Sequence, residues 1–243
     1  MQKFASQIIN QELTIQNDQD KKSLNFLKDL DVSKLVLKWA NRVDFESIPD
    51  KVQHLNITGD FNLNGIQKLQ LKTFIYKYEP QKQKENWNDK DEIINLNQIQ
   101  TMERLQLCGF TALDFQSFQE LNQLKCLNLS QNKLMKPSQI NFQNLTRLEM
   151  VHSSLHDISF LESIQNLTEV SQNKIKNLDP LRNHKHLKYL DASDNEIKQL
   201  PKSLGTNLRL LKTMVNLNSQ IWLITIQKIQ NYLLNLQMYN YQI

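Results

Sequence analysis

Apolar residues return at fixed places along the middle of this chain. The stretch LKCLNLSQNKL begins at Leu124 and the stretch LKYLDASDNEI begins at Leu187, and the two share apolar residues at five relative places and Asn at the ninth. Their starts are 63 residues apart, which is three times 21. A period of this size indicates repeated structural units that stack on one another.

The same spacing continues between and beyond the two stretches. Copies begin at residues 102, 124, 145, 167, 187 and 208, which gives steps of 22, 21, 22, 20 and 21 residues. Weaker copies begin at Val32, Val52 and Leu71. The copy at Leu167 lacks two residues of the pattern, so we expect its strand to be pinched or bulged near residues 168–172.

Each copy predicts a short strand and a return segment. In a strand, alternate side chains point to opposite faces, so Leu127 and Leu129 would face inward and Asn128 outward. Strands of successive copies would lie about 4.8 Å apart in a parallel sheet. Apolar residues in the return segments recur every three positions, as at Leu155 and Ile158, which favours 3₁₀ or irregular structure over an α-helix.

An Asn follows most of the predicted strands, where the chain turns away from the sheet. Its amide has both donors and an acceptor, so it can satisfy the backbone groups that the turn leaves unpaired. We expect a ladder of such side chains, interrupted by Phe110 and Ser153. Its members are Asn132, Asn173, Asn195 and Asn216.

The copies resemble the leucine-rich repeat family over at least residues 99–216, most clearly in the two quoted stretches. The resemblance implies an α/β fold: a solenoid with a curved parallel sheet on its concave face, a 3₁₀ or irregular convex side, and helical caps. The 22-residue pattern is similar to that of protein phosphatase regulatory proteins. The same pattern occurs in an axonemal dynein light chain and a spliceosomal repeat protein.

Three parts are expected along the chain. Residues 1–31 would form an N-terminal cap, 32–218 the repeats with an insertion at about 78–91, and 219–243 a C-terminal cap helix, since exposed ends of a solenoid need covering. Leu24 and Leu27 have helical spacing, as do apolar residues between Ile221 and Leu236. A helix that docks into a partner is the alternative for the C-terminal segment.

The sequence offers no catalytic or metal constellation. No Gly-rich loop precedes a Lys, and no Ser has a fixed His and Asp context. His152 and His156 have the separation of a helical zinc pair, but they would diverge across the bend after the strand. Cys108 and Cys126 would be offset by about 13 Å, beyond disulfide reach. We therefore expect a protein that is not an enzyme, with no metal and no cofactor.

Charge and hydropathy limit the kinds of partner and the cellular location that we expect. The net charge is +4, and the Lys residues are spread along the chain, whereas nucleic-acid surfaces are usually clustered. The N-terminal stretch has no apolar core of signal-peptide length, and no run of about 18 apolar residues occurs. We expect no nucleic acid, no membrane and a cytoplasmic location.

The outward strand positions form two columns on the predicted concave face. The third place of each copy holds Arg104, Cys126, Arg147, Glu169, Tyr189 and Leu210. The fifth place holds Gln106, Asn128, Glu149, Asp191 and Lys212, with the copy at Leu167 unassigned. Seven or more strands give a surface about 30 Å long, enough for a protein interface.

These columns predict a non-catalytic, protein-binding scaffold. Arg104, Arg147 and Tyr189 are of the residue types that often carry binding energy, although an ordinary solvated sheet face is the alternative for any single residue. The partner would be another protein, bound by a monomer or by a subunit of a hetero-complex. The resemblance implies two narrower roles: a regulatory subunit of a Ser/Thr protein phosphatase, or a structural subunit of a ciliary or cytoskeletal assembly.

Overall fold

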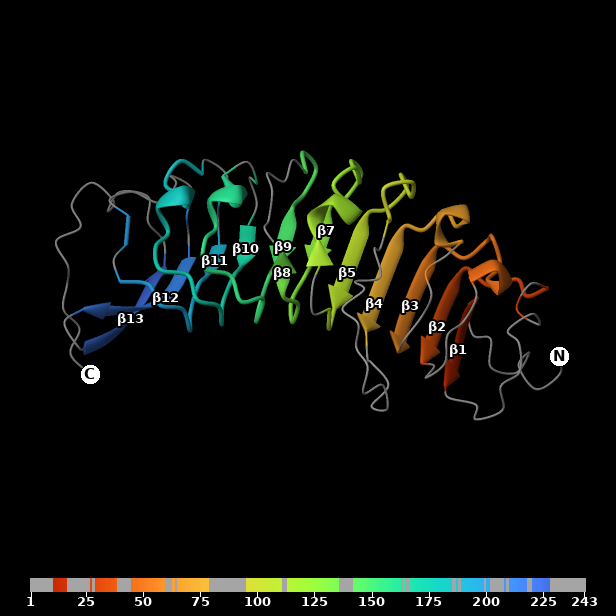
Figure 1. Ribbon diagram of the computed structural model, residues 1–243, viewed down its shortest axis with the longest axis horizontal. Coiled ribbons are helices and arrows are strands. Elements are labelled where there is room, and N and C mark those ends of the chain that lie inside the picture. The colour runs from red at the N-terminus through yellow and green to blue at the C-terminus, as the bar shows by residue number, and fades with distance from the viewer. Residues whose placement is uncertain are drawn as a thin grey trace.

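Eleven strands stack side by side in one long sheet (Figure 1). The computed structural model describes residues 11–16, 27, 29–38, 45–59, 63, 65–78, 95–110, 113–135, 142–162, 164, 167–184, 187, 189–198, 200–201, 208, 210–217 and 220–227. The strands, in their order across the sheet, are β1 (Glu12–Gln16), β2 (Lys34–Lys38), β3 (His54–Gly59), β4 (Thr73–Tyr78), β5 (Arg104–Cys108), β7 (Cys126–Asn128), β9 (Arg147–Glu149), β10 (Leu167–Glu169), β11 (Tyr189–Asp191), β12 (Leu210–Leu217) and β13 (Gln220–Gln227).

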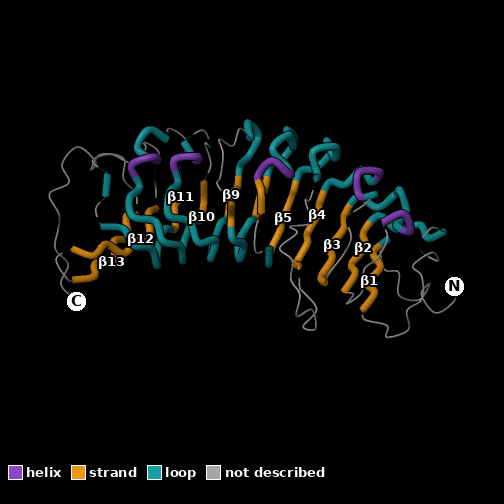
Figure 2. The backbone as a smooth tube through the Cα atoms, in the orientation of Figure 1, coloured by secondary structure: helices purple, strands orange, loops and turns teal. Residues whose placement is uncertain are grey.

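Neighbouring strands are parallel throughout, apart from the antiparallel pair β12 and β13. The chain returns from each strand to the next along the opposite side of the stack, where the 3₁₀ turns lie (Figure 2). These turns are η2 (Phe45–Ser47), η3 (Ile66–Lys68), η4 (Phe115–Ser117), η5 (Ser159–Leu161) and η6 (Asp179–Leu181). A small second sheet on this side pairs β6 (Leu113–Asp114) with β8 (Leu134–Met135).

The core lies between the sheet and the return segments. Inward residues of successive strands occupy matching register positions, as Leu105, Leu127 and Leu148 do, and all are buried. Return segments close the other side with residues spaced by three, such as Ile158 and Leu161, which is the spacing that predicted 3₁₀ turns. A single repeat cannot bury both faces of its strand, so stacking supplies the stability.

The described part of the chain is therefore a parallel β-solenoid, and the expected repeat architecture is confirmed. Figure 1 shows an elongated, gently arched stack with the strands along its inner side. The helical caps expected of an α/β solenoid are absent from the described residues, whose helices are all three-residue 3₁₀ turns.

Both described ends of the sheet are strands where the sequence predicts caps. At the N-terminal end, β1 lies within residues 1–31 and pairs with β2 over five residues. At the C-terminal end, the helix predicted for Ile221–Leu236 is wrong as far as Gln227, because this segment is β13. Apolar residues stand at almost every position from Ile221 to Ile226, so their spacing does not distinguish a helix from a strand. Leu24, residues 79–91 of the expected insertion, and residues 228–243 lie outside the described residues.

The irregular copy contains a bulge rather than a deletion. Leu167 is in register with Leu148, and Glu169 is in register with the next residue of β9, so Thr168 is an extra residue in β10. Ile164 is fully buried and stands three residues before Leu167, so this copy begins at Ile164. The predicted bulge is confirmed, but its cause is one added residue, and the sheet continues across β10.

Candidate binding face of the sheet

One side of the main sheet carries the side chains that point away from the core, and we call this side the open face. Strand register arranges its residues in rows that cross the strands. The first row runs through Glu12, Lys34, His54, Thr73, Arg104, Cys126 and Arg147 and resumes at Tyr189 and Leu210. The second row runs through Thr14, Val36, Asn56, Ile75, Gln106, Asn128, Glu149, Glu169, Asp191 and Lys212.

A third row lies on β1 to β5, where the strands are longer than those from β7 to β11. It comprises Gln16, Lys38, Thr58, Lys77 and Cys108. The open face is therefore three rows wide at its N-terminal end and two rows wide from β7 to β11.

The register groups the predicted face residues largely as expected. Arg104, Cys126 and Arg147 are consecutive in the first row. The predicted place of Glu169 in the same column is wrong, because the bulge in β10 moves Glu169 into the second row between Glu149 and Asp191. The second row therefore holds carboxylates on three successive strands.

The centre of the open face is a connected polar group. The guanidinium of Arg147 donates through Nε and Nη2 to Glu149 Oε1. Asn128 Nδ2 donates to Glu149 Oε2 at 2.6 Å, and Asn128 Oδ1 accepts from the Ser130 N–H at 2.9 Å. The Glu149 side chain is only 17% exposed, whereas that of Arg147 is 62% exposed. Arg147 is thus accessible, but a partner must compete with Glu149 for its donors.

A second polar group lies towards the C-terminal end of the face. Asp191 Oδ1 accepts from the N–H and the hydroxyl of Ser193, at 3.1 and 2.6 Å. Lys212 Nζ lies 3.5 Å from Asp191 Oδ2, and its side chain is half exposed. An exposed pair of this kind adds little stability, so these groups remain available for a partner.

The N-terminal end of the face contains cations with fewer partners. The side chain of Arg104 is exposed and has no hydrogen bond or ion pair with another described residue. Lys34 Nζ pairs with Glu12 Oε2 at 2.7 Å. Val36 and Ile75 of the second row are half-buried aliphatic side chains on the open face. The two predicted columns begin at β5 with Arg104 and Gln106 and do not include β1 to β4, although the weaker copies at Val32, Val52 and Leu71 already marked the outward positions of β2 to β4.

One ion pair borders the first row. Lys125 Nζ donates to Glu103 Oε2 at 2.8 Å. This hydrogen bond, and then the charge of Lys125, lower the pKa of Glu103 below its ordinary value. Both side chains are about half exposed, so the pair keeps Glu103 ionised without adding much stability.

Buried Asn side chains support the edge of the face where the short strands end. Asn173 Nδ2 donates to the carbonyl oxygens of Met150, Val170 and Ser171 at 2.6, 3.0 and 3.0 Å. Its Oδ1 accepts from the N–H groups of Ser153 and Leu155 at 2.8 and 3.1 Å. One side chain therefore satisfies backbone groups of two adjacent repeats.

Asn132 and Asn195 make equivalent hydrogen bonds. Asn132 Nδ2 donates to the carbonyls of Leu107 and Leu129, and Asn195 Nδ2 donates to those of Val170, Ala192 and Ser193. Ser153 occupies the corresponding place with one donor, which reaches Leu129 O at 3.0 Å. Asn216 does not belong to this ladder, because it lies within β12 opposite Ile221, and the chain does not turn away there.

The other candidate chemistry stays dispersed. His152 and His156 are exposed, while His184 is buried with Nε2 2.9 Å from Leu161 O, and burial lowers the pKa of His184. No group of three or more His, Cys, Asp or Glu in the described part could hold a metal ion. Cys108 and Cys126 form no disulfide; Cys126 aligns with Arg104, and Cys108 Sγ lies 3.0 Å from Gln131 Oε1. None of the described helices is long and apolar enough to cross a bilayer.

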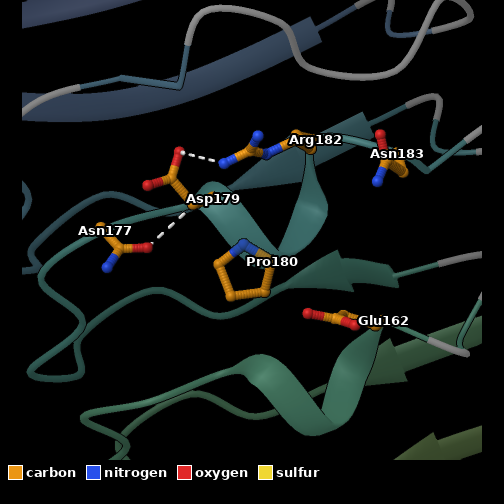
Figure 3. Close-up of a pocket in the computed structure, with 6 residues that line it drawn as sticks. All are labelled: Glu162, Asn177, Asp179, Pro180, Arg182 and Asn183. Carbon is orange, nitrogen blue, oxygen red and sulfur yellow. Dashed lines mark hydrogen bonds and ion pairs between the residues drawn. The ribbon is translucent and has the colours of Figure 1, made fainter.

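A shallow pocket of about 440 Å³ lies on the opposite side of the solenoid, between η5 and η6 (Figure 3). Arg182 points towards Asp179 at 3.8 Å, and Asn177 Oδ1 accepts from the Asp179 N–H at 3.0 Å. The lining is polar and contains neither a nucleophile nor a base beside one. Its residues are Glu162, Asn177, Asp179, Pro180, Arg182 and Asn183.

Neither a family model nor a curated protein matches this sequence. Solved structures do match the fold. An internalin (inlF) from Listeria monocytogenes matches with a TM-score of 0.57 and 16% identity, over 85% of this chain and 68% of that chain. The functional domain of InlJ from the same organism matches with a TM-score of 0.57 and 20% identity, over 80% and 42%. The APL1 leucine-rich repeat domain matches with a TM-score of 0.51 and 16% identity, over 76% and 50%.

These structural neighbours are leucine-rich repeat proteins, and the parallel-sheet solenoid described above is the shape they share with this chain. Identities of 20% or less show a common fold and carry no function across.

Proposed function

We propose that this chain is a non-catalytic scaffold that binds another protein through the open face of its sheet. The observation that carries the proposal is the continuity of the second row, which crosses ten neighbouring strands from Thr14 to Lys212. At about 4.8 Å per strand this row is over 40 Å long, and neighbouring rows are about 7 Å apart. Such a surface can accommodate the roughly 800 Å² per partner of a standard interface.

Fixed side chains make this surface suitable for recognition. Glu149 is oriented by Arg147 and Asn128, and Asp191 is oriented by Ser193. Groups held in place lose little conformational entropy on binding, so more of their interaction energy appears as affinity. The sheet also offers a partner two exposed guanidinium groups, Arg104 and Arg147, of the residue type enriched at interface hot spots.

Narrower roles follow from the sequence resemblance. With the bulged copy starting at Ile164, the steps between repeat starts become 22, 21, 19, 23 and 21 residues, which stays near the 22-residue class. That class supports a regulatory subunit of a Ser/Thr protein phosphatase as one role and a structural subunit of a ciliary or cytoskeletal assembly as another. Both roles are inside the cell, and the identity of the bound protein separates them.

Site-specific photo-crosslinking tests the proposal. A photoreactive amino acid is placed on the open face at Gln106 or Lys212, and on the opposite side at Glu162 or Arg182. Crosslinked proteins are identified by mass spectrometry in the source cells. We expect one protein to be captured reproducibly from the open-face positions. Capture of a protein only from Glu162 and Arg182 would show that the open face is not the binding surface.

A further inference from the structure

The two ends of the open face differ in charge. The outward positions of β1 to β5 hold four cations and one carboxylate: Lys34, Lys38, Lys77, Arg104 and Glu12. The outward positions from β7 to β12 hold two cations and three carboxylates: Arg147, Lys212, Glu149, Glu169 and Asp191. Screening acts over about 8 Å at physiological salt, so a partner meets two separate electrostatic regions.

The basic end also has an apolar strip. Val36 and Ile75 are in the second row on β2 and β4, with Asn56 between them, so the two aliphatic side chains are about 10 Å apart. From β7 to β12 the second row contains no apolar residue. The second row of the acidic end therefore lacks what the basic end has, which is a pair of half-exposed aliphatic groups within a cationic surface.

Cations flank this strip on both sides. Lys34 and Arg104 stand in the first row, and Lys38 and Lys77 stand in the third row, each about 7 Å from the second. Glu12 already neutralises Lys34, but the side chains of Arg104 and Lys38 have no hydrogen bond or ion pair with another described residue. Two cations on opposite sides of the strip are therefore open to a ligand.

We propose that the part of the open face formed by β2 to β5 binds an acidic amphipathic α-helix of a partner protein, with two apolar side chains seated on Val36 and Ile75. The inference rests on the proposed function, because it names the partner's chemistry at one end of the same face. Residues i and i+7 of a helix are about 10.5 Å apart, which matches the spacing of the two aliphatic groups. Carboxylates on the helix flanks then reach the first and third rows, as in other helix-in-groove complexes.

Nucleic acid is the alternative ligand for a surface with these cations. Proteins that bind single strands usually stack bases on aromatic side chains. The outward positions of β2 to β5 carry no Phe, Tyr or Trp, and the strip between the cations is aliphatic. A helix with apolar and acidic residues satisfies both features, whereas a phosphate backbone satisfies only the charge.

A peptide selection tests this inference and does not require the partner to be identified first. Random 16-residue peptides displayed on phage are selected against the full chain, and selected sequences are synthesised with a fluorescent label for anisotropy titration. We expect acidic peptides with apolar residues seven positions apart. Their affinity should fall at least about tenfold with K38E/R104E, and about tenfold with I75S.

The matched control is K212E, which reverses a cation at the other end of the same face and should change the affinity by less than about twofold. Circular dichroism checks that each variant is folded. The inference is overturned if no peptide is selected, if the selected peptides are basic or neutral, or if K212E weakens binding as much as K38E/R104E does. Binding of a labelled 16-nucleotide single strand in preference to every peptide overturns it as well.

The photo-crosslinks separate this inference from the broader proposal. A partner captured from Lys212 but never from Gln106 would leave the scaffold role standing and place the contact at the acidic end. Capture from Gln106, followed by loss of capture in K38E/R104E, supports both.

Discussion

The N-terminal and C-terminal parts of the sheet provide partners for their buried backbone N–H and C=O groups in two different ways. From β2 to β5 the strands have five or six residues, and their backbone groups pair with the next strand along this length. From β7 to β11 the strands have three residues, and the side chains of buried Asn132, Ser153 and Asn173 and of half-buried Asn195 take over where pairing ends. Buried N–H and C=O groups must be paired in either case.

Strand length in turn determines the shape of the open face. Each long strand adds one further outward residue, which creates the third row at Lys38, Thr58, Lys77 and Cys108. The Asn ladder ends the strands earlier and leaves two rows. The wide end is the basic one and the narrow end is the acidic one, so a backbone difference in the repeats becomes a difference in what each end can bind.

The two parts meet at Gly109 and Phe110. The ring of Phe110 stacks on Tyr78 with centroids 5.4 Å apart, and it packs edge-on against Tyr76. The N–H of Phe110 donates to Asn132 Oδ1, so this residue is the first one served by the ladder. An aromatic side chain thus fills the place that an Asn fills in later repeats.

The largest effect is expected from removing one ladder side chain. Asn173→Ala leaves three carbonyls and two N–H groups without their present partner in a buried site, so we expect the free energy of unfolding to fall by about 3–4 kcal/mol. Urea denaturation measures the change. Asn144→Ala is the control: this exposed side chain donates one hydrogen bond, to Asn122 O, and its loss should cost less than about 0.5 kcal/mol. Equal losses in the two variants would show that the ladder does not stabilise the short-strand repeats.

The next effect is expected at the junction. A Cβ at Gly109 would lie 2.3 Å from the backbone oxygen of Tyr78. The φ of Gly109 is 91°, a backbone conformation that is strained for any other residue. We expect Gly109→Ala to lower the free energy of unfolding by about 2–3 kcal/mol. Gly65→Ala separates the two causes, because its φ is 86° but its Cβ would have no atom closer than 3.6 Å, so backbone strain alone should cost about 1 kcal/mol. If both variants lose the same stability, the close approach to Tyr78 is not what requires Gly109.

Much of this architecture is encoded locally and can be predicted from the sequence. The 21–22-residue period identifies the inward residues Leu105, Leu127 and Leu148, and the same period aligns Arg104, Cys126 and Arg147 on the open face. Periodicity suffices here because each repeat contacts mainly its neighbours, so spacing along the chain translates directly into position in the stack.

Features that depend on pairing between distant residues could not be predicted. Ile164 and Leu167 both fit the start of a repeat. Only the pairing of β10 with β9 shows that the repeat starts at Ile164 and that Thr168 is the extra residue. β13 is apolar on both sides, so its spacing leaves strand and helix equally possible until β12 is beside it. At the site, the sequence places Arg147 and Glu149 on one face, but their ion pair depends on side-chain orientation.

Acidification should weaken the short-strand part through His184, which joins the return segments of two repeats by its contact with Leu161 O. Burial lowers the pKa of His184, so the unfolded chain takes up a proton first as the pH falls below about 6.5. Stability is therefore complete above this pH and decreases towards pH 5. The lowered pKa values of Glu103 and Asp157 act at lower pH, since their ordinary values are 4.5 and 3.8.

His184→Gln keeps a donor for Leu161 O but does not titrate, so its urea midpoint should fall less between pH 7.5 and 5.5 than that of the parent chain. The long-strand part has no equivalent His contact among the described residues, so a spectroscopic probe there should follow the change only when the whole stack unfolds. The same loss of midpoint in both proteins would assign the pH dependence to other groups.

The smallest effect concerns backbone strain next to the ladder. Gln131, His152, Gln172 and Asp194 each precede a ladder residue and have φ between 53° and 63°, whereas the junction of the long-strand part uses Gly109 at this place. Gln172→Gly should relieve the left-handed strain by more than the added chain entropy costs, which raises the free energy of unfolding by about 0.5 kcal/mol. Lys174→Gly, an exposed position not among the residues with positive φ, should lower it by about 0.5–1 kcal/mol in the same urea titration. If both variants lose the same stability, Gln172 adopts its conformation without strain. The turns next to the ladder in the short-strand repeats would then form without a cost in backbone strain.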